Sequence, residues 1–351
     1  ISKLKIIYAN GTSEEIITDH SWKHSYGPIT KNNVYLGDVY DARKEVSGWN
    51  LPGFNDTDWI ESVENQGPGG QLQKAFFPTV QITKTINPVS IIPRQNNKYI
   101  ADMGENFTGI YRINLKGKEG DTIIFRFGER LHENGELNTM TAVAGQIKRK
   151  GMGGIGSPDT AWQTDKYIFG KNGNIWYSPE FTFHVYRYME ISGLHYTPEL
   201  NDIKGLALNT NVKKTGSFNC SSDIINSIQD ATERTFLANL ISVQSDCPGR
   251  EKFGYGGDLN ATSEAFIYNF DMQDFYRKTV YDWIDAMNDT AFIDTAPYVG
   301  IEYCGLSWES AFLITQYMLY LYYNDLELIK ELYQLNLKWM EKAERIHPGG
   351  L

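Results

Sequence analysis

The apolar residues of this chain follow two different periods, and the change between them comes near residue 212. Up to about residue 205, short runs rich in Ile, Tyr, Phe and Val are separated by Gly, Asn, Asp and Pro. Examples are KLKIIYA, KYIADM, DTIIFRFGE and YRYMEISGL. Repeated runs of this kind, with no helical segment between them, predict antiparallel β-sandwiches.

Two further features organise this β part. The stretch 109–129, GIYRINLKGKEGDTIIFRFGE, holds two alternating runs around Lys118–Asp121 and predicts a hairpin. The run Ile86–Asn97 carries two prolines and is expected to join two sandwich units. We therefore expect a first β-sandwich domain over residues 1–85 and a second over residues 86–211.

Beyond residue 212 the apolar residues recur at helical spacing. Ile224, Ile225, Ile228 and Ala231 fall on one face of a predicted helix, and Ser222 is placed to cap its start. Further helices are expected over 271–287, 307–323 and 325–346, with about five in all. Residues 212–351 should thus form the beginning of a helical domain, which makes the chain a multidomain β + α protein.

Composition excludes several classes of function. The chain has 351 residues and a formal net charge of −10, so it would repel a phosphate backbone and nucleic acid is not an expected partner. No apolar run approaches the roughly 20 residues that span a bilayer. Cys220, Cys247 and Cys304 form neither a disulfide framework nor a CxxC metal pair, and a free buried thiol is expected at each.

Two apparent ligand motifs are set aside. GMGGIG, Gly151–Gly156, has the G-x-G-x-x-G spacing of a dinucleotide site, but the strand before it and the helix after it are missing. It is interpreted as a glycine-rich loop, so no cofactor is expected. The six histidines are scattered without ligand spacing, so they are interpreted as solvated or structural and no metal site is expected.

The candidate chemistry lies in QSDCPGREKFGYGGDLNATSEAF, residues 244–266. Asp246, Glu251 and Asp258 fall within thirteen residues that look too glycine-rich for a helix and too irregular for a strand. The acids do not match the alternating oxygens of an EF-hand. A solvated surface turn is one interpretation. The interleaved residues Cys247, Phe253 and Tyr255 favour burial instead, with Arg250 as a strong partner for the acids and Lys252 as a weaker one.

Glycoside hydrolysis needs such an arrangement, because one carboxyl group must hold its proton until it reaches the leaving-group oxygen. Apolar surroundings and neighbouring carboxylates raise a carboxyl pKa, whereas a contacting Arg lowers it. Glu251 is the position at which these effects meet. The flanking acids can bind sugar hydroxyls, and Tyr255 and Trp308 can stack on pyranose C–H groups.

The stretch DCPGREKFGYGGD closely resembles the acidic signature of bacterial α-L-rhamnosidases, glycoside hydrolase family 78. VYDAR and GWNLPGFNDTDW resemble the accessory N-terminal β-sandwich of that family, and IDTAPY and GLSWESAF resemble stretches of its helical domain. The resemblance covers nearly the whole chain, in the family's order. It implies two antiparallel β-sandwich domains followed by the first helices of an (α/α)6 barrel, and inversion of configuration without a metal in the chemistry.

The resemblance also implies roles for individual residues. Glu251 would be the general acid, and Asp246 and Asp258 would bind the sugar and tune Glu251. Arg250 would be a neighbouring structural or sugar-binding residue, and Trp308 part of an aromatic wall. Tyr255 would bind substrate where many members have Trp, which would alter stacking.

The family's general base is a Glu far downstream of the signature. We therefore expect the base to lie beyond Leu351 and the chain to be a fragment. Glu302 and Glu309 are not assigned as substitutes, because they stand in the wrong part of the pattern. An inverting pair needs carboxyl groups about 6.5–9.5 Å apart with a water between them.

Three functions remain open at this stage. The first is an exo-acting α-L-rhamnosidase whose partner is a carbohydrate with terminal rhamnose. The second is a related glycosidase acting on another terminal sugar, and the third is a non-catalytic carbohydrate-binding fragment. Because rhamnose-capped glycosides and polysaccharides lie outside the cell, a periplasmic or secreted location is expected.

Overall fold

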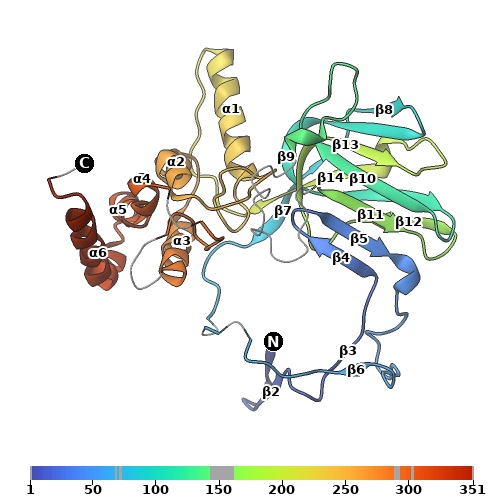
Figure 1. Cartoon of the computed structure of the whole chain (residues 1–351), viewed down its shortest axis with the longest axis horizontal. Helices are drawn as coiled ribbons and strands as arrows, with labels where there is room; N and C mark the ends of the chain where they lie inside the picture. Colours follow the sequence, from blue (N-terminus) through green and yellow to red (C-terminus); the bar gives the residue numbers. More distant parts are fainter. Residues whose placement is uncertain are drawn as a thin grey trace.

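The computed structural model describes residues 2–67, 69–70, 73–142, 162–287, 293–301 and 304–349. The glycine run 151–156 and Glu302 therefore lie outside the described residues. As predicted, strands come first along the chain and helices follow (Figure 1). None of the helices in the described ranges is both long and apolar enough to cross a membrane.

Fourteen strands precede the helices in the described ranges, and most of them belong to one sheet of ten. The strands are β1 (Lys3–Ile7), β2 (Ser13–Ile17), β3 (Lys23–His24), β4 (Ile29–Asn33), β5 (Gly37–Asp41), β6 (Ile60–Glu61), β7 (Val80–Ile86), β8 (Ser90–Arg94), β9 (Lys98–Gly117), β10 (Thr122–Gly128), β11 (Thr164–Ile168), β12 (Gly173–Tyr177), β13 (His184–Ser192) and β14 (Ile203–Thr210). The large sheet has the order β4-β5-β11-β10-β13-β9-β14-β7, with β8 and β12 also paired to β9.

This sheet corrects the expected pair of separate antiparallel sandwiches. β4, β5 and β7 come from the first 86 residues, yet they join the sheet built by the later strands. The pairing of β5 with β11 is parallel, so the sheet is mixed. The stacked rings of Tyr40 and Tyr167, with centroids 5.6 Å apart, hold this junction. Alternating apolar residues predict a strand, but they do not specify which strand lies beside it.

The predicted hairpin is also wrong, although its turn is present. Asp121 N donates to Lys118 O at 3.0 Å, which closes the turn between β9 and β10. The two strands do not pair with each other, because β13 lies between them and bonds to both. β9 is long enough to serve two regions of the curled sheet: its first half pairs with β8 and β13, and its second half with β12 and β14.

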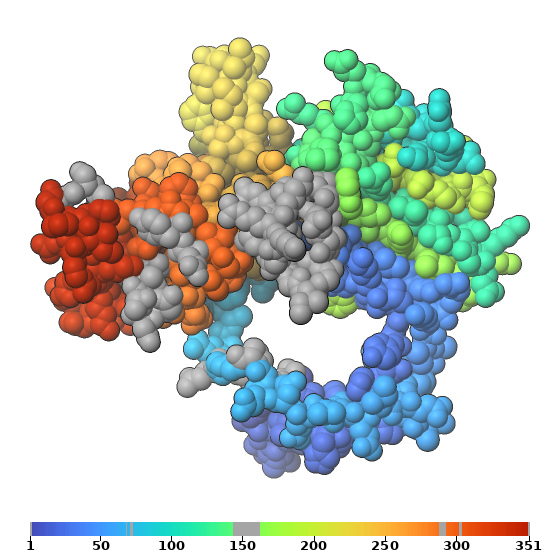
Figure 2. Space-filling model, viewed as in Figure 1, coloured from blue at the N-terminus to red at the C-terminus, as the bar shows by residue number. Residues whose placement is uncertain are grey.

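Aromatic residues fill the core of the sheet. Tyr111, Phe125 and Tyr186 are fully buried, and their rings belong to a cluster of tilted and edge contacts. In contrast, β1, β2, β3 and β6 form small two-stranded pieces in the N-terminal arm. Figure 2 shows an opening between this arm and the large sheet.

The helical part contains six helices within the described ranges: α1 (Asp223–Ala238), α2 (Gly256–Asn269), α3 (Gln273–Ala286), α4 (Leu306–Glu309), α5 (Ala311–Tyr323) and α6 (Leu326–Ile346). The predicted helices are present, although the one expected over 307–323 is divided at Ser310 into α4 and α5. The predicted buried face of α1 is wrong. Ile224, Ile225 and Ile228 are exposed, whereas Phe236 is buried and stacks on Phe266 of α2 at 4.0 Å.

Helix α2 is the element that the sequence did not predict. It begins at Gly256, inside the stretch that looked too rich in glycine to be helical. The glycines stand in its first turn, where a lack of side chains allows close packing rather than interrupting a helix interior. The core of the helical part lies between α2, α3, α5 and α6 and includes Phe275, Trp283 and Phe312.

Candidate active site

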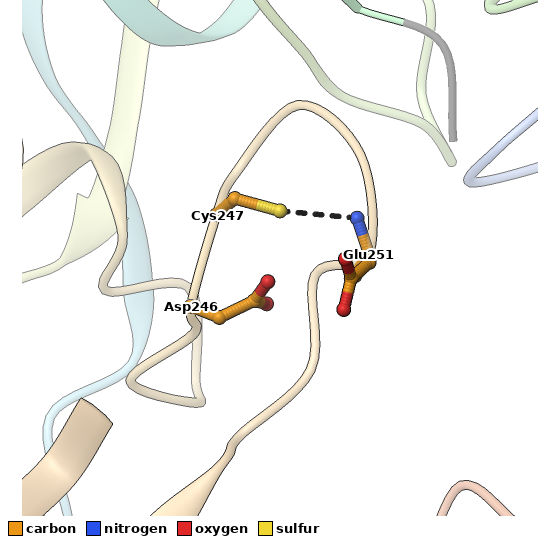
Figure 3. A group of neighbouring side chains, drawn as sticks. All are labelled: Asp246, Cys247 and Glu251. Carbon is orange, nitrogen blue, oxygen red and sulfur yellow. Dashed lines mark hydrogen bonds between the residues drawn. The ribbon is translucent and has the colours of Figure 1, made fainter. Parts of the chain in front are cut away.

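The loop between α1 and α2 carries two of the three predicted acids and closes on itself through its own hydrogen bonds. We call residues 246–253 the acid loop. Asp246 N donates to Phe253 O at 2.9 Å, and Phe253 N donates back to the Asp246 carboxylate at 3.1 Å. Glu251 N donates to the Cys247 sulfur at 3.2 Å (Figure 3). These bonds fix an irregular path that is neither helix nor strand.

The path brings Asp246 and Glu251 together. A carboxylate oxygen of each, with the Cys247 sulfur, lies within 4.8 Å of the others, and all three residues are half-buried. Figure 3 shows both carboxyl groups on the inner side of the loop. Burial, followed by the negative charge of Asp246, raises the pKa of Glu251. Tyr255 and Arg250 act in the opposite direction, so the sequence-based expectation of competing effects at Glu251 is matched in the structure.

Asp258 lies in the first turn of α2, just beyond the acid loop. Burial raises its pKa, and the next largest cause is again the charge of Asp246. Asp246 is therefore the carboxylate that couples electrostatically to both of the other acids. Raised pKa values at both Glu251 and Asp258 are expected where carboxyl groups crowd into a partly desolvated place.

The two predicted aromatic residues come from different elements and both lie at the start of α2. Tyr255 is the N-cap residue of α2, and its hydroxyl interacts with the Glu251 carboxyl. Trp308 belongs to α4 and packs on the start of α2. A Cβ atom on Gly257 would lie 2.5 Å from the Trp308 ring, and one on Gly256 would lie 2.1 Å from the Trp308 carbonyl oxygen. These glycines are therefore required by the close approach of Trp308.

Two predicted partners of the acids behave differently from each other. Arg250 is exposed, and its charge lowers the pKa of Glu251. Lys252, which the sequence suggested as a second partner, points away from the acids. Its Nζ donates to Phe183 O at 3.2 Å and lies 3.8 Å from the centre of the Phe183 ring. Arg250 and Lys252 are two residues apart but have different surroundings, so proximity in the sequence did not predict their contacts.

Glu309, which the sequence analysis does not assign as a general base, has partners within the helical part. The side chain is buried, with its carboxylate 3.6 Å from Lys342 Nζ and accepting a hydrogen bond from Trp339 Nε1 at 3.2 Å. This carboxylate links α4 to α6, and removing one partner of such a buried pair would leave the other charge uncompensated. It is not presented to the acid loop.

Asp246, Cys247 and Glu251 are also close enough to be considered as metal ligands. The thiolate is the form of Cys that binds metals. Burial raises the pKa of the Cys247 thiol, and the neighbouring Asp246 raises it further. The sulfur also accepts the Glu251 N–H, which helps to shape the loop.

Family models match successive parts of the chain. The α-L-rhamnosidase N-terminal domain matches residues 1–84, and the bacterial α-L-rhamnosidase concanavalin-like domain matches residues 93–209. The bacterial α-L-rhamnosidase 6-hairpin glycosidase domain matches residues 213–350. The chain belongs to the bacterial α-L-rhamnosidase family. The order of the three matches is the order inferred from the signature motifs.

Individual members of the family give the same result. An α-L-rhamnosidase of Formosa agariphila is 31% identical over 342 residues, which cover 94% of this chain and 35% of the relative. An α-L-rhamnosidase of Streptomyces avermitilis is 29% identical over 356 residues, covering 100% of this chain and 33% of the relative. The chain thus spans about a third of the length of these curated relatives.

Solved structures of α-L-rhamnosidases superpose closely on the chain. The enzyme from Dictyoglumus thermophilum aligns with a TM-score of 0.90 at 36% identity, covering 99% of this chain and 38% of that one. The Streptomyces avermitilis enzyme, solved in complex with L-rhamnose, aligns with a TM-score of 0.86 at 28% identity and covers 98% of this chain and 32% of that one. The curled sheet followed by helices is therefore the family's architecture.

Sequence reasoning missed the residues of the β part that contact the acid loop. Tyr35 donates from its hydroxyl to Glu251 O at 2.7 Å, and Gln163 donates to Gly249 O. Neither residue stands near the rhamnosidase signature, and neither belongs to a motif. His184, classed with the scattered histidines, is fully buried in this contact region. No local pattern in the sequence could have connected these residues to the loop.

Proposed function

We propose that this chain carries the general-acid side of an inverting glycoside hydrolase that releases terminal α-L-rhamnose from glycosides or polysaccharides. The observation that carries the proposal is the raised pKa of Glu251, whose carboxyl group faces Asp246 within the acid loop. A raised pKa keeps a carboxyl group protonated closer to neutral pH, which a proton donor requires. Membership of the rhamnosidase family and the L-rhamnose complex of a relative support the choice of sugar.

In the proposed reaction, the Glu251 carboxyl donates its proton to the glycosidic oxygen while the bond from that oxygen to the anomeric carbon breaks. A water molecule attacks the anomeric carbon from the opposite face and loses a proton to a general base, so the released sugar has inverted configuration. Asp246 and Asp258 accept hydrogen bonds from sugar hydroxyls, and the charge of Asp246 favours the protonated form of Glu251. Trp308 and Tyr255 offer aromatic faces to the sugar ring.

The proposal assigns no general base among the described acids. Glu309 is occupied by Lys342 and Trp339, and a base must be free to accept a proton from water. The reaction as written needs no cofactor. Because its substrates lie outside the cell, the proposal includes a periplasmic or secreted location.

The test is the dependence of Glu251→Gln on the leaving group, measured with protein expressed from the complete open reading frame. On an aryl α-L-rhamnoside with a poor leaving group, kcat/KM should fall by about 10²–10⁴-fold, because proton donation is lost. On an activated aryl rhamnoside, which departs without full protonation, the loss should be much smaller. Glu309→Gln removes a carboxylate of the same size and should change activity only a few-fold. Near-wild-type turnover of the poor substrate by Glu251→Gln would overturn the assignment.

A second candidate is a related glycosidase specific for another terminal sugar. The observation that favours it is Tyr255, whose hydroxyl interacts with Glu251 at a position where many members are expected to carry Trp. A phenol hydroxyl can both donate and accept a hydrogen bond, whereas an indole N–H can only donate one. A panel of aryl glycosides at one concentration distinguishes the two, since a strong preference for a sugar other than rhamnose would favour this candidate.

A further inference from the structure

The acid loop is held from outside by the β part of the chain as well as by its own hydrogen bonds. Tyr35, which precedes β5, donates its hydroxyl to the Glu251 carbonyl oxygen at 2.7 Å. The Lys252 side chain reaches the carbonyl oxygen and ring of Phe183, which precedes β13. These contacts lie on either side of the peptide bond that follows Glu251. The residue that carries the proposed acid is therefore anchored directly to a different part of the molecule.

The third anchor is the side-chain amide of Gln163, which precedes β11. Its Nε2 donates to two carbonyl oxygens, those of Ala142 and of Gly249 in the acid loop. Two carbonyl acceptors can be satisfied only by the NH₂ end of the amide. The orientation of the side-chain amide is thus fixed, and its oxygen points away from these two carbonyl groups. Gln163 is 1% exposed, so water does not compete for these bonds.

Behind Gln163 stands a second pair of buried polar groups. His184 Nδ1 lies 3.2 Å from the Gln163 oxygen and His184 Nε2 lies 2.9 Å from an Asp165 carboxylate oxygen. Because the amide oxygen can only accept, Nδ1 must carry the hydrogen of the first bond. The other Asp165 oxygen accepts from Asp38 N of β5 at 2.9 Å. His184 and Asp165 are both 0% exposed, so the imidazole ring and the amide it supports are held in one orientation.

Gly249 packs so closely against the sheet that there is no space for a side chain at this position. A Cβ atom on Gly249 would lie 2.5 Å from Val185 Cγ1 of β13. The loop main chain therefore touches the sheet at the same residue whose carbonyl oxygen Gln163 binds. Gln163 and Lys252 also have positive φ angles, 44° and 60°, in a region that residues with side chains rarely adopt. Such conformations persist where the surrounding contacts determine them.

We infer that Gln163 is a positioning residue for Glu251, and that His184 and Asp165 act through it by fixing the orientation of its amide. This inference rests on the proposed function, because it concerns the placement of the proposed acid. The sheet holds Gly249, two residues before Glu251, and the bonds within the loop carry that placement to the carboxyl group. A displacement of about 1 Å in a reacting group can cost about 10²-fold in rate.

The experiment compares Gln163→Met with Gln316→Met in protein from the complete open reading frame. Met has a similar length to Gln and removes the donors. Gln316 is a matched control, because it is also buried but its Nε2 donates to Phe312 O and Asn336 instead of the acid loop. The first measurement is hydrogen–deuterium exchange of the peptide 246–255. We expect faster exchange there in Gln163→Met than in Gln316→Met, at matched fractions of folded protein.

The second measurement is the kinetics of aryl α-L-rhamnoside hydrolysis. Gln163→Met should lower kcat about 10-fold or more while KM changes less than about 3-fold. The proton donor is displaced, whereas the proposed sugar contact of Asp258 lies in α2, outside the acid loop. Gln316→Met should leave kcat near the wild-type value. If Gln163→Met does not fold, Gln163→Asn takes its place. Its amide is one methylene shorter, so it remains polar but cannot span the same distance.

The outcomes separate the inference from the proposed function. Unchanged exchange of the acid loop in the Gln163 variant overturns the inference whatever the activity. Faster exchange with an unchanged kcat also overturns it, because the contact is then structural. If the unmodified protein does not hydrolyse rhamnosides, the proposed function fails. The exchange measurement still decides whether Gln163 holds the loop in that case.

Discussion

The hydroxyl oxygen of Tyr35 lies 2.7 Å from the main-chain carbonyl oxygen of Glu251, although 216 residues separate them in the sequence. The bond joins a loop before β5 to the loop that carries the proposed acid. It leaves the Glu251 carboxyl free to face Asp246, because it uses the main chain. Burial and the nearby charges of Asp246, Cys247 and Glu251 raise the pKa of Tyr35 to about 12, so its hydroxyl remains a donor at neutral pH.

Tyr35→Phe should therefore loosen the acid loop without removing a ring. Loss of this hydrogen bond should lower the free energy of unfolding by about 1 kcal/mol. We expect kcat for an aryl rhamnoside to fall several-fold with little change in KM. Tyr99→Phe is the matched control, since the Tyr99 hydroxyl makes a 3.4 Å contact with Thr197 on the surface. Equal kinetic effects of the two variants would contradict a role for Tyr35 in the loop.

Asp246→Asn should shift the pH dependence of activity. The charge of Asp246 raises the pKa of Glu251, so its removal lowers that pKa. A general acid must be protonated, and activity is lost as pH rises through its pKa. The alkaline limb of the kcat/KM profile should accordingly move to lower pH, together with a higher KM from lost sugar contacts. An alkaline limb that stays in place would show that Asp246 does not control the proton on Glu251.

Lys252→Met should flatten the pH dependence of stability. Burial lowers the pKa of Lys252 from 10.5 to about 7. Between these values the unfolded chain holds the proton and the folded chain releases it, so the free energy of unfolding rises with pH over that window. Below about pH 7 the Lys252 side chain is charged in both the folded and the unfolded protein. The folded protein then carries the full free-energy cost of burying that charge. A shift of this size corresponds to a rise on the order of 4–5 kcal/mol across the whole window, which should disappear in the variant.

Urea unfolding at pH 6, 8 and 10 measures this difference. Lys330→Met is a suitable control because Lys330 is exposed and pairs with Glu327 on the surface of α6. Its unfolding free energy should follow the wild-type pH dependence. A Lys252→Met protein with the same slope as wild type would mean that the ammonium group stays charged in the folded protein.

Gly257→Ala tests the close approach of Trp308. The new Cβ atom would lie 2.5 Å from the indole ring, so the ring or the start of α2 must move. We expect a loss of about 1–3 kcal/mol in the free energy of unfolding, as for other overpacked sites. Gly27→Ala, where a Cβ atom would have no heavy atom within 4 Å, should be nearly neutral. Thermal unfolding of both variants checks the prediction, which an equally stable Gly257→Ala protein would contradict.

Much of the architecture followed from local patterns. The helices from α1 onward were predicted wherever apolar residues repeat at helical spacing, and the turn at Lys118–Asp121 was found from its composition. The pairing of the strands was not predicted, because β5 and β13 lie in the sheet beside strands that are far away in the sequence. Helix α2 was missed because glycines that allow Trp308 to approach look like helix breakers in the sequence alone.

For the site, the sequence identified the acids because they stand close together in a dense motif. It also predicted the opposing effects on Glu251, since burial, carboxylates and Arg250 are all local to that motif. The sequence could not identify Tyr35, Gln163 or His184, because a contact between distant segments produces no recognisable pattern in the sequence of either segment. Lys252 was misread for the related reason that neighbours in a loop face different surroundings.

The parallel pairing of β5 with β11 limits how this protein can be recombined with its relatives. A chimera cut near residue 85 would import β4, β5 and most of β7, whereas β11 and β14, the strands that pair with β5 and β7, would belong to the recipient. It would also exchange Tyr35 without the acid loop to which its hydroxyl donates. Hybrids in which residues 29–41 and the later strands of the sheet come from the same parent should be soluble far more often than hybrids divided near residue 85.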